Sequence, residues 1–487
     1  MTSFQCIVIG SGNAGCCAAF SAAEAGCDKG AFRTVHEGVQ DLVAVVDKAS
    51  AEQAGSIDMD PYTREEFLGD IMRLGDGKPD PVLAGAVVDA SRDTVTWLAT
   101  KIGLPFMFSF HRQAYNVGGR QKFWGGLVLC TDDGGKGLIA AHHRALAKAG
   151  VDVWFNCPAL EITMENGAVS GVVVQKDGER MHLRSPAVVL AAGGFEGNPQ
   201  LREKYLGPGW ERAILRGTGD GFKLAAAVGA RQTGDWAGCH STCWDADAPK
   251  DGGERNLTNQ FTKSGYPLGI MVNSAGKRFV DEGEDYRNYT YAKFGKAIQN
   301  QPGSYVFQVW DSKAIGMLRK EEYGDGIVKK IFADSIEELA EKLSAQGLEA
   351  KQEFVETVNE FNAAVKDFEA ENLDSTWNPA IKDGMSTQST RMQLSLPKSN
   401  WALTIDQAPF MAVKVACGIT FTFGGLAIDP ETAGVISEKE SKVIPGLFCT
   451  GEMVGLFHKN YPGGSGLTAG AVFGRKAGQA AAKLVVH

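Results

Sequence analysis

The chain has 487 residues, 44% hydrophobic and 22% charged, which is typical of a soluble globular protein and excludes disordered, collagen-like and coiled-coil classes. Its 49 basic and 58 acidic residues give a formal net charge of −9 without a Lys/Arg-rich stripe, so we expect no nucleic-acid partner. The sequence contains no run of 18 apolar residues, no secretory leader and no cysteine pattern typical of a disulfide framework, so we expect a cytoplasmic protein that does not span a membrane.

The N-terminal segment predicts a strand, a glycine turn and a helix. The apolar run 4–9 leads into GSGNAG at 10–15, which is followed by an Ala-rich stretch. In a GxGxxG turn, Gly10 permits the tight turn, Gly12 lets the backbone approach a pyrophosphate, and Gly15 lets the helix pack on the strand. We expect dinucleotide binding by Gly10, Gly12, Asn13, Ala14 and Gly15; the alternative is a glycine turn without a ligand.

The second strand of this dinucleotide-binding unit is missing from the sequence. A Rossmann unit needs a strand that ends in Asp or Glu about 20 residues further on, where the carboxylate binds the ribose hydroxyls. Here Gly26 is followed by CDKGAFR at 27–33, which contains no apolar strand. We therefore expect the adenosine half of the site to be incomplete.

The remaining elements alternate between helical and strand-like patterns. We predict helices at 81–102, 138–149, 336–346 and 349–369, strands at 151–155 and 188–190, and a strand-like segment at 427–449. Alternating residues with turns at Asn166-Gly167 and Asp177-Gly178 predict a β-meander over 161–184. We expect a loop at 106–129 and glycine turns at 191–195 and 463–466, the second of which opens a long helix.

Several motifs in order along the chain together resemble a known family. They are GSGNAG at 10–15, GAFRTVHEG at 30–38, LAAGGF at 190–195, TGDG at 218–221, GCHSTCWD at 238–245, GKRFVDE at 276–282, YRNYTYAKFG at 286–295, CGITFTFGG at 417–425, GLFCTGEMVG at 446–455 and NYPGGSGLTAGAVFGR at 460–475. The chain resembles the flavoprotein subunit family of fumarate reductase and succinate dehydrogenase, which also includes 3-ketosteroid Δ1-dehydrogenases. Its motifs are most similar to those of the tricarballylate dehydrogenase branch.

This resemblance implies an α/β fold with two domains. A Rossmann-like FAD-binding domain would comprise residues 1–231 and 402–487, and an inserted α+β capping domain would comprise residues 232–401. The family binds FAD and oxidises or reduces a CH–CH bond beside an electron-withdrawing group. We expect non-covalent FAD, but the chain lacks the strand and GGNS-like loop that family members carry before GAFR, so we expect FAD to be retained poorly.

The resemblance also implies which residues contact the cofactor. These are Ala31, Ala192, Gly193, Gly194, Asp220, Glu452, Gly464, Ser465, Gly466 and Leu467. The amides and dipole at the start of a helix suit the negative charge that gathers on reduced flavin. The alternatives are ordinary turns for the glycines, a helix cap for residues 463–466 and a surface carboxylate for Glu452.

Two further residues match positions that handle substrate in fumarate reductases. His240 matches a histidine that holds a substrate carboxylate. The alternatives are a core histidine or a metal ligand together with Cys239 and Cys243. The spacing of these three residues does not suit a zinc site, so we expect no metal. Arg287 matches an arginine that delivers a proton, with the alternative that it only clamps a carboxylate. The neighbouring acids Asp281, Glu282 and Asp285 are candidates to lie beside it.

The dicarboxylate clamp of fumarate reductases is not reproduced in full. Its second arginine falls on Tyr461, and its histidine pair falls on Thr420-Phe421. Tyr461 before a double glycine instead resembles the ketosteroid branch, where the tyrosine hydroxyl polarises a carbonyl; the alternative is a core tyrosine. We therefore assign catalytic roles to Arg287, His240 and Tyr461.

The resulting hypothesis is an FAD-dependent dehydrogenase or reductase of a small polycarboxylate similar to tricarballylate or fumarate. Hydride would pass to or from flavin N5, and a separate electron-transfer partner would complete the cycle. One alternative is a ketone-activated dehydrogenase of the 3-ketosteroid Δ1 type. Another is a flavin-free, non-catalytic relative that binds a ligand or partner, which the missing segment after Cys27 favours.

Overall fold

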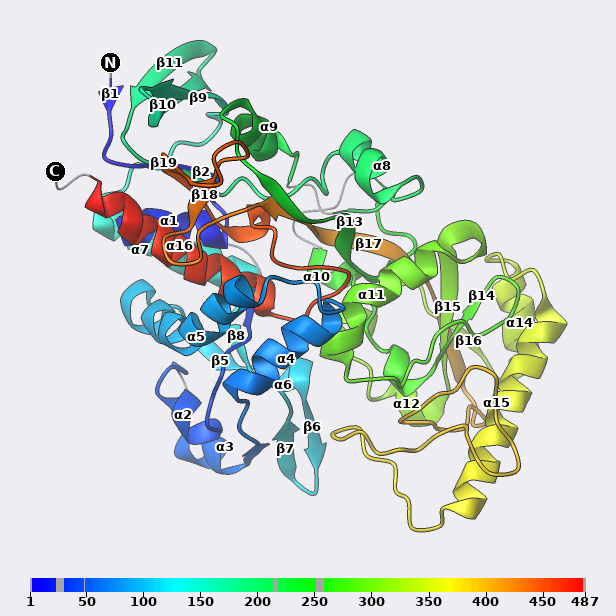
Figure 1. The fold of residues 1–487 in the computed structure, drawn as a ribbon. Helices are drawn as coiled ribbons and strands as arrows, with labels where there is room; N and C mark the ends of the chain where they lie inside the picture. Colours follow the sequence, from blue (N-terminus) through cyan, green and yellow to red (C-terminus); the bar gives the residue numbers. More distant parts are fainter. Residues whose placement is uncertain (1, 23–29, 48, 214–216, 251–257, 485–487) are drawn as a thin grey trace. The chain divides into compact units, whose positions relative to one another are not determined.

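The computed structural model describes residues 2–22, 30–47, 49–213, 217–250 and 258–484. It divides into two compact units (Figure 1). Unit 1 comprises Met1–Leu206, Arg216–Cys239 and Phe421–His487, and unit 2 comprises Gly207–Leu215 and His240–Thr420. Among the described residues, none of the helices combines the length and apolarity that a bilayer crossing requires.

A four-stranded sheet forms the centre of unit 1. Its order is β18 (Gly434–Ile436), β19 (Val443–Cys449), β12 (Val188–Leu190) and β2 (Ile7–Ile9). β12 pairs in parallel with both β2 and β19, so the carboxyl ends of these three strands lie at one edge of the sheet. Within the described residues β2 has β12 as its sole neighbour, so no second strand of a first βαβ unit lies beside it. The expected α/β arrangement around a parallel sheet is thereby confirmed.

One further four-stranded sheet and two three-stranded sheets complete the described sheets of unit 1. They are β1 (Thr2–Ser3), β11 (Glu179–Arg184), β10 (Ala168–Lys176) and β9 (Ala159–Glu165); β3 (Ala31–Phe32), β8 (Leu129–Thr131) and β5 (Phe106–Phe108); and β4 (Ile57–Met59), β7 (Arg120–Phe123) and β6 (Ala114–Val117). The β9–β10–β11 meander confirms the prediction for 161–184. Its turn residues Asn166-Gly167 and Asp177-Gly178 all have positive φ, which two-residue hairpins require.

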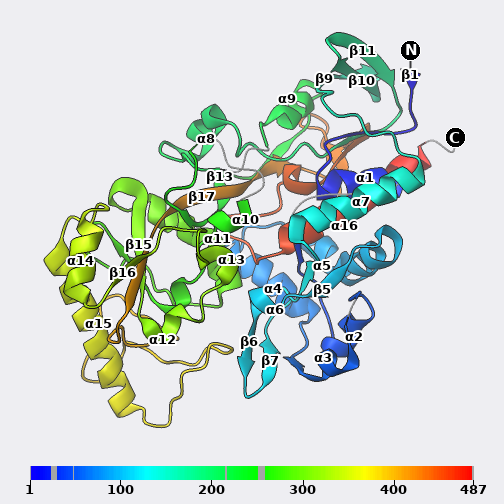
Figure 2. The same cartoon turned by 180° about the vertical axis from the view of Figure 1, so that it is seen from behind.

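Among the helices of unit 1, one near the N-terminus packs against one near the C-terminus. The helices are α1 (Asn13–Ala22), α2 (Val39–Val43), α3 (Ala51–Gly55), α4 (Arg64–Leu74), α5 (Pro81–Trp97) continued by the π-turn Leu98–Ile102, α6 (Phe110–Gln113), α7 (Gly134–Ala149), α8 (Pro199–Leu206), α9 (Asp220–Ala227), the 3₁₀ turn Gly451–Met453, and α16 (Ser465–Lys483). α1 and α16 lie side by side in both views (Figures 1 and 2). Glycine makes this approach possible, because a Cβ on Gly474 would lie 2.5 Å from the Ala14 carbonyl oxygen.

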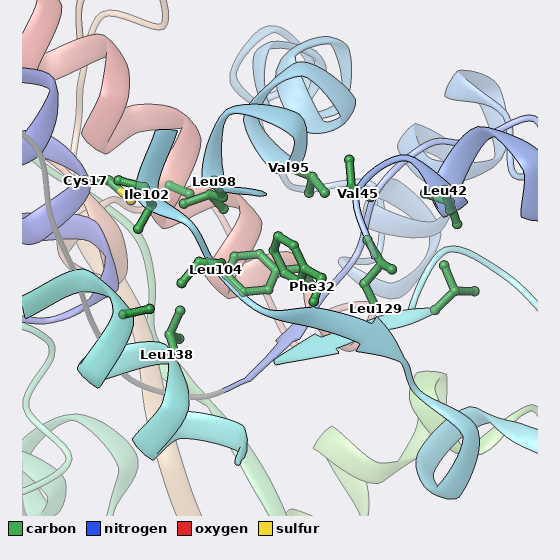
Figure 3. Packing of buried hydrophobic residues seen from close by; sticks show 14 of the residues in the cluster. Cys17, Phe32, Leu42, Val45, Val95, Leu98, Ile102, Leu104, Leu129 and Leu138 are labelled. Atoms are coloured by element: carbon green, nitrogen blue, oxygen red, sulfur yellow. The ribbon is translucent and has the colours of Figure 1, made fainter. Parts of the chain in front are cut away.

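One apolar cluster links α1, α5 and α7 to the β3–β8–β5 sheet. Phe32, Leu104 and Leu129 are among its buried members, and Figure 3 shows Phe32 and Leu104 near its centre. Because this cluster contains residues on both sides of the segment 23–29, it anchors β3 independently of that segment.

Two predictions for unit 1 were wrong. The segment 106–129, expected to be a loop, contains β5, α6, β6, β7 and the start of β8. Gly118 and Gly119 both have positive φ and form the turn of the β6–β7 hairpin, so glycines that suggested a loop in fact join two strands. The segment 151–155, expected to be a strand, is irregular, and its Phe155 is 63% exposed.

Unit 2 is built on a five-stranded sheet with helices on both faces. The strands are β13 (Gln232–Asp245), β17 (Phe410–Leu426), β15 (Tyr305–Trp310) and β14 (Ile270–Asn273) in that order, with β16 (Ile331–Ala333) also paired to β17. The start of β13, up to Cys239, and the end of β17, from Phe421, belong to unit 1. The helices are α10 (Thr258–Phe261), the 3₁₀ turns Tyr266–Leu268 and Pro302–Ser304, α11 (Arg287–Gln299), α12 (Ser312–Ile315), α13 (Lys320–Tyr323), α14 (Ile336–Ser344) and α15 (Lys351–Glu371).

The two faces of this sheet follow the period-two alternation of its strands. On β17, Phe410 and Ala412 join the core formed with α14 and α15, while Met411 and Val413 join the core formed with α11. α14 and α15 lie next to each other (Figure 1), and both confirm the helices predicted at 336–346 and 349–369. α11 packs on this sheet through Phe294 and Ile298, and Arg287 is its first residue.

Candidate functional site

The first glycine turn of unit 1 combines two crowded glycines with an open one. Gly10 has φ +114°, and an added Cβ would come within 3.0 Å of the Ala191 backbone. A Cβ on Gly15 would likewise come within 3.0 Å of the Ala191 side chain. A Cβ on Gly12 would meet no atom within 4 Å, and Gly12 is exposed. The fold therefore requires Gly10 and Gly15, whereas Gly12 leaves the backbone accessible to a ligand.

The start of α1 is joined to the start of α16. Asn13 is buried, and its Nδ2 donates a hydrogen bond to the Leu467 carbonyl oxygen at 2.8 Å. Its Oδ1 has no hydrogen-bond partner among the described residues. Ala14 packs against Gly470 on the same pair of helices. The structure thus brings together Asn13, Ala14 and Leu467, three of the predicted cofactor contacts.

The second glycine turn holds a carboxylate at the end of β19. Residues 192–194 follow β12, and a Cβ on Gly194 would come within 3.0 Å of the Glu452 carboxylate. Glu452 Oε1 accepts hydrogen bonds from the Thr422 backbone N–H at 2.7 Å and from Thr422 Oγ1 at 3.2 Å. Glu452 therefore has a fixed position beside Gly193 and Gly194, as carboxylates at the ends of parallel strands often do in ligand sites.

Asp220 faces solvent, and a different carboxylate is buried beside this turn. Asp220 accepts hydrogen bonds from Thr218 and Lys223, which hold the pKa of its carboxyl below the usual range, and its side chain is 61% exposed. Glu196, by contrast, is 1% exposed and accepts a hydrogen bond from the Gly217 backbone N–H at 2.9 Å. The sequence analysis missed Glu196, although it directly follows the LAAGGF motif.

The third glycine turn begins α16 and presents two backbone donors. The first N–H groups of a helix have no acceptor within the helix. Here Ser465 N–H donates to the Pro462 carbonyl and Thr468 N–H donates to the Gly464 carbonyl. In the part of the chain that the structure describes, the N–H groups of Gly466 and Leu467 remain as donors for a ligand. The helix dipole favours a negatively charged one.

A buried arginine, which the sequence analysis did not select, supports this third turn. Arg33 is fully buried, and its Nε donates to the Gly463 carbonyl oxygen at 2.8 Å. Its Nη1 donates to Tyr62 Oη at 2.8 Å, and Tyr62 Oη donates to Asp70 Oδ2 at 2.7 Å. Asp70 also lies 3.7 Å from Arg33 Nη1 and supplies the opposite charge. The predicted contact Ala31 lies in β3, two residues before Arg33.

The predicted loss at the adenosine end lies outside the described residues, because it falls on 23–29, which include Cys27. The rest of the set fits a dinucleotide. Gly12 leaves an open approach. Among the described residues, the N–H groups of Gly466 and Leu467 and the buried Oδ1 of Asn13 have no hydrogen-bond partner.

Arg287 of unit 2 is connected to a buried carboxylate. Arg287 is the first residue of α11, and its Nη1 donates to Ser264 Oγ at 3.2 Å. Ser264 donates to Glu322 Oε2 through its Oγ at 2.6 Å and its backbone N–H at 2.7 Å. Burial raises the pKa of Glu322, but Arg319, Arg287 and the Ser264 hydrogen bonds outweigh burial, so its pKa is lowered. The Arg287–Ser264 pair thus contacts an ionised carboxylate.

The three acids close to Arg287 in sequence have other partners. Asp281 accepts a hydrogen bond from the Ser399 backbone N–H at 3.0 Å, Glu282 pairs with Arg278, and Asp285 pairs with Lys382 at 2.9 Å. The sequence analysis missed Glu322, which lies 35 residues after Arg287 on α13. No local pattern marks it, because only the tertiary fold brings α13 to Ser264.

His240 contacts the same helix as Arg287. It lies on β13, is 4% exposed, and its ring is edge to face with that of Tyr291 at a centroid distance of 4.8 Å. Tyr291 is four residues after Arg287 and therefore one helical turn away. α11 thus connects Arg287 and His240 within unit 2.

Tyr461 belongs to unit 1 and lies in an aromatic cluster. It is 5% exposed, and its ring contacts those of Phe421, Phe423 and Phe457 at centroid distances of 5.0, 6.1 and 5.1 Å. These apolar rings shield the hydroxyl-bearing ring from water, which strengthens any hydrogen bond that it makes.

Comparisons with known proteins identify the family of the chain. A family described as "FAD binding domain" matches residues 5–467. The probable fumarate reductase Ifc3 of Shewanella frigidimarina is 27% identical over 98% of this chain and 75% of its own length. The 4-oxocyclohex-2-ene-1-carboxylate 5-dehydrogenase of Sinomonas cyclohexanicum is 29% identical over 72% of this chain and 60% of its own length, so the chain spans only part of either relative.

Solved structures show the same fold. The open conformation of a flavocytochrome c3 fumarate reductase is similar over all of this chain and 79% of its own, with 25% identity and a TM-score of 0.69. The 3-ketosteroid delta1-dehydrogenase of Sterolibacterium denitrificans is similar over 99% of this chain and its whole own length, with 20% identity and a TM-score of 0.73. With its glycine turns, its central parallel sheet and a family match over nearly its full length, the chain belongs to the FAD binding domain family of flavoprotein oxidoreductases.

Proposed function

We propose that the chain is an FAD-dependent oxidoreductase that reduces the double bond of a small unsaturated carboxylate or forms it in the reverse reaction. The observation that carries the proposal is the position of Arg287 at the N-terminus of α11, joined through Ser264 to Glu322. A guanidinium and a helix N-terminus both attract an anion, so this end of α11 suits a substrate carboxylate or a developing carbanion. Relatives named as fumarate reductases agree with this substrate class.

Unit 1 supplies the groups that would hold the cofactor. Gly12 would admit the pyrophosphate, Asn13 and Glu452 would offer side-chain acceptors, and Gly466 and Leu467 would donate to the negative end of the isoalloxazine. FAD, when bound, supplies the acceptor or donor for hydride at N5. We propose non-covalent binding, with the fully buried Arg33 keeping the third glycine turn in place.

Unit 2 would supply the substrate contacts and would correspond to the capping domain. Arg287 would stabilise the charge that develops as hydride adds, and it would donate the proton to the neighbouring carbon. Its ordinary pKa above 12 makes it a weak acid, but a carbanion is basic enough to take that proton. Ser264 and Glu322 would keep the guanidinium in position, and His240 would hold the substrate carboxylate.

The finer features of the proposal concern substrate and partner. Tricarballylate and fumarate are the first substrates to test, because the motifs resemble the tricarballylate branch and relatives are named as fumarate reductases. A separate electron donor or acceptor would complete turnover, and Tyr461 would polarise the substrate.

A second candidate is a ketone-activated dehydrogenase. The observation that favours it is the aromatic cluster around Tyr461, because phenyl rings suit an apolar ketone better than a second carboxylate. The 4-oxocyclohex-2-ene-1-carboxylate 5-dehydrogenase among the relatives bears both a ketone and a carboxylate in the name of its substrate. A cyclic oxo-carboxylate is therefore the substrate that separates this candidate from the first.

The experiment begins with the purified protein, its colour and the mass of any released cofactor, since a flavin-free protein would favour a non-catalytic relative. FAD is then added, and turnover of tricarballylate, fumarate and a cyclic oxo-carboxylate is measured with an artificial electron carrier. Arg287→Lys keeps the charge but loses the planar fork, so turnover should fall by a factor of about 100 while FAD content stays the same.

Arg391→Lys is the matched control, because Arg391 is a 63% exposed arginine of the same unit paired with Asp367. It should leave turnover unchanged. Turnover of Arg287→Lys within threefold of the parent would show that Arg287 does not carry the proton step.

A further inference from the structure

Asn288 is a buried amide that follows Arg287 and that the fold itself does not use. It is 1% exposed, and neither its Nδ2 nor its Oδ1 has a hydrogen-bond partner among the described residues. Buried side-chain amides are nearly always hydrogen bonded, since an unpaired buried polar group destabilises a protein. Selection for stability alone would favour leucine at this position, so the amide calls for a functional explanation.

Asn288 lies on the face of α11 that carries the candidate substrate residues. Residues three and four apart share a helix face, so Asn288 aligns with Tyr291, whose ring contacts His240 at 4.8 Å. Further along the same face, a Cβ on Gly295 would come within 3.0 Å of the Ser241 backbone, so this face packs on β13. Asn288 is thus one helical turn from the contact between α11 and His240.

We propose that Asn288 determines substrate specificity by hydrogen bonding the substrate through both atoms of its amide. Nδ2 only donates and Oδ1 only accepts, so the preferred substrate would present an acceptor and a donor side by side, as a carboxamide does. A carboxylate only accepts and would leave Oδ1 buried without a partner. The inference rests on the proposed function, because it assumes that Arg287 and Asn288 meet one substrate.

The substrate class that follows is an unsaturated carboxylate with a neighbouring carboxamide-like group. His240 would take the carboxylate, Arg287 would act at the double bond, and Asn288 would take the group at the other end of that bond. A site built to hydrogen bond such a group strongly rejects the analogue that lacks it, because its own polar atoms are then left unpaired. Fumarate and its monoamide, fumaramate, differ by this group alone and have nearly the same shape.

The test compares these two compounds on the FAD-loaded protein and its Asn288→Leu variant. The parent should use fumaramate with a kcat/KM at least tenfold above that for fumarate, and Asn288→Leu should abolish this preference. Without ligand, the variant should melt no lower than the parent, because no hydrogen bond within the described residues is lost. The rise in melting temperature caused by fumaramate should be lost in the variant, which gives a readout independent of turnover.

Thr242→Val is the matched control, since Thr242 is 1% exposed in the same unit and its hydroxyl also lacks a partner among the described residues. It should keep the parent's preference. Asn288→Asp retains the size of the side chain but only accepts, so it should still bind fumaramate and should bind fumarate less well than the parent does.

Three results would overturn the inference. An unchanged fumaramate-to-fumarate ratio in Asn288→Leu, with turnover still dependent on Arg287, would reject the role of Asn288 and leave the proposed function standing. A lower melting temperature with equal loss on both compounds would assign Asn288 a structural role. A parent that neither binds nor converts either compound would reject the inference, and failure to convert tricarballylate and the cyclic oxo-carboxylate as well would reject the proposed function.

Discussion

Replacing Arg33 by methionine should destabilise unit 1 and loosen the glycine turn before α16. The fully buried guanidinium donates to the Gly463 carbonyl and to Tyr62 Oη, both at 2.8 Å, and lies 3.7 Å from Asp70. A hydrogen bond to a charged group contributes about 1.5–3 kcal/mol, so two such bonds set the scale. Methionine recovers part of the packing, and we therefore expect a loss of about 3–5 kcal/mol in the free energy of unfolding.

The assay for Arg33→Met is urea unfolding of the FAD-free protein, followed by titration with FAD. FAD affinity should also fall, because the Gly463 carbonyl is no longer held and the amides of Gly466 and Leu467 lose their alignment. Arg64→Ala is the control, since Arg64 and Asp89 are 49% and 54% exposed and solvent-exposed ion pairs contribute little to stability. A loss below about 1 kcal/mol in Arg33→Met, equal to that of the control, would refute the reasoning.

Three further predictions concern the first glycine turn and acidification. Gly12→Ala should leave the melting temperature of the FAD-free protein unchanged and weaken FAD binding. Gly10→Ala should lower the melting temperature, because the Cβ added at Gly10 meets the backbone and the one added at Gly12 does not. Equal melting temperatures of the two variants would contradict this prediction. Burial lowers the pKa of His142 to about 3, so the free energy of unfolding should fall by on the order of 4–5 kcal/mol between about pH 6.5 and pH 3. In His142→Leu the free energy of unfolding, measured over the same pH range, should change less. Because the pKa of Glu322 is lowered in the folded protein, its ionised carboxylate stabilises the fold above about pH 4.5, and this stabilisation is lost at lower pH. Glu322→Gln should therefore lower the melting temperature at pH 7 and make it less sensitive to pH below 4.5. An unchanged melting temperature at pH 7 would argue against the charged network.

The glycine turns could be predicted from sequence because their requirement is local. Gly10 and Gly464 have positive φ and lie against other parts of the backbone or core, and both stand in short motifs after a strand or before a helix. The same local reasoning failed at 106–129, where Gly118 and Gly119 form a hairpin turn. A glycine pair indicates a turn, but the strands beside it depend on partners that are distant in sequence.

The supporting residues could not be predicted, because their partners lie far away along the chain. Arg33 meets Gly463 across 430 residues, and Glu322 meets Ser264 across 58 residues. Each is an ordinary charged residue in its own segment, and only burial distinguishes it. Asn288 is similar, since only the tertiary structure shows that its buried amide has no hydrogen-bond partner among the described residues.

The pairing of α1 with α16 also bears on how the protein is made. The central sheet of unit 1 takes β2 from residues 7–9 and β19 from residues 443–449, and α1 packs on a helix that ends at Lys483. Such non-local contacts form slowly, and domains usually fold as units while the chain emerges from the ribosome. Residues 240–420 of unit 2 are therefore synthesised in full before unit 1 can close, so the apolar surface of α1 waits for almost the entire chain. A ribosome stalled before α16 should hold a folded unit 2 beside an open, protease-sensitive unit 1.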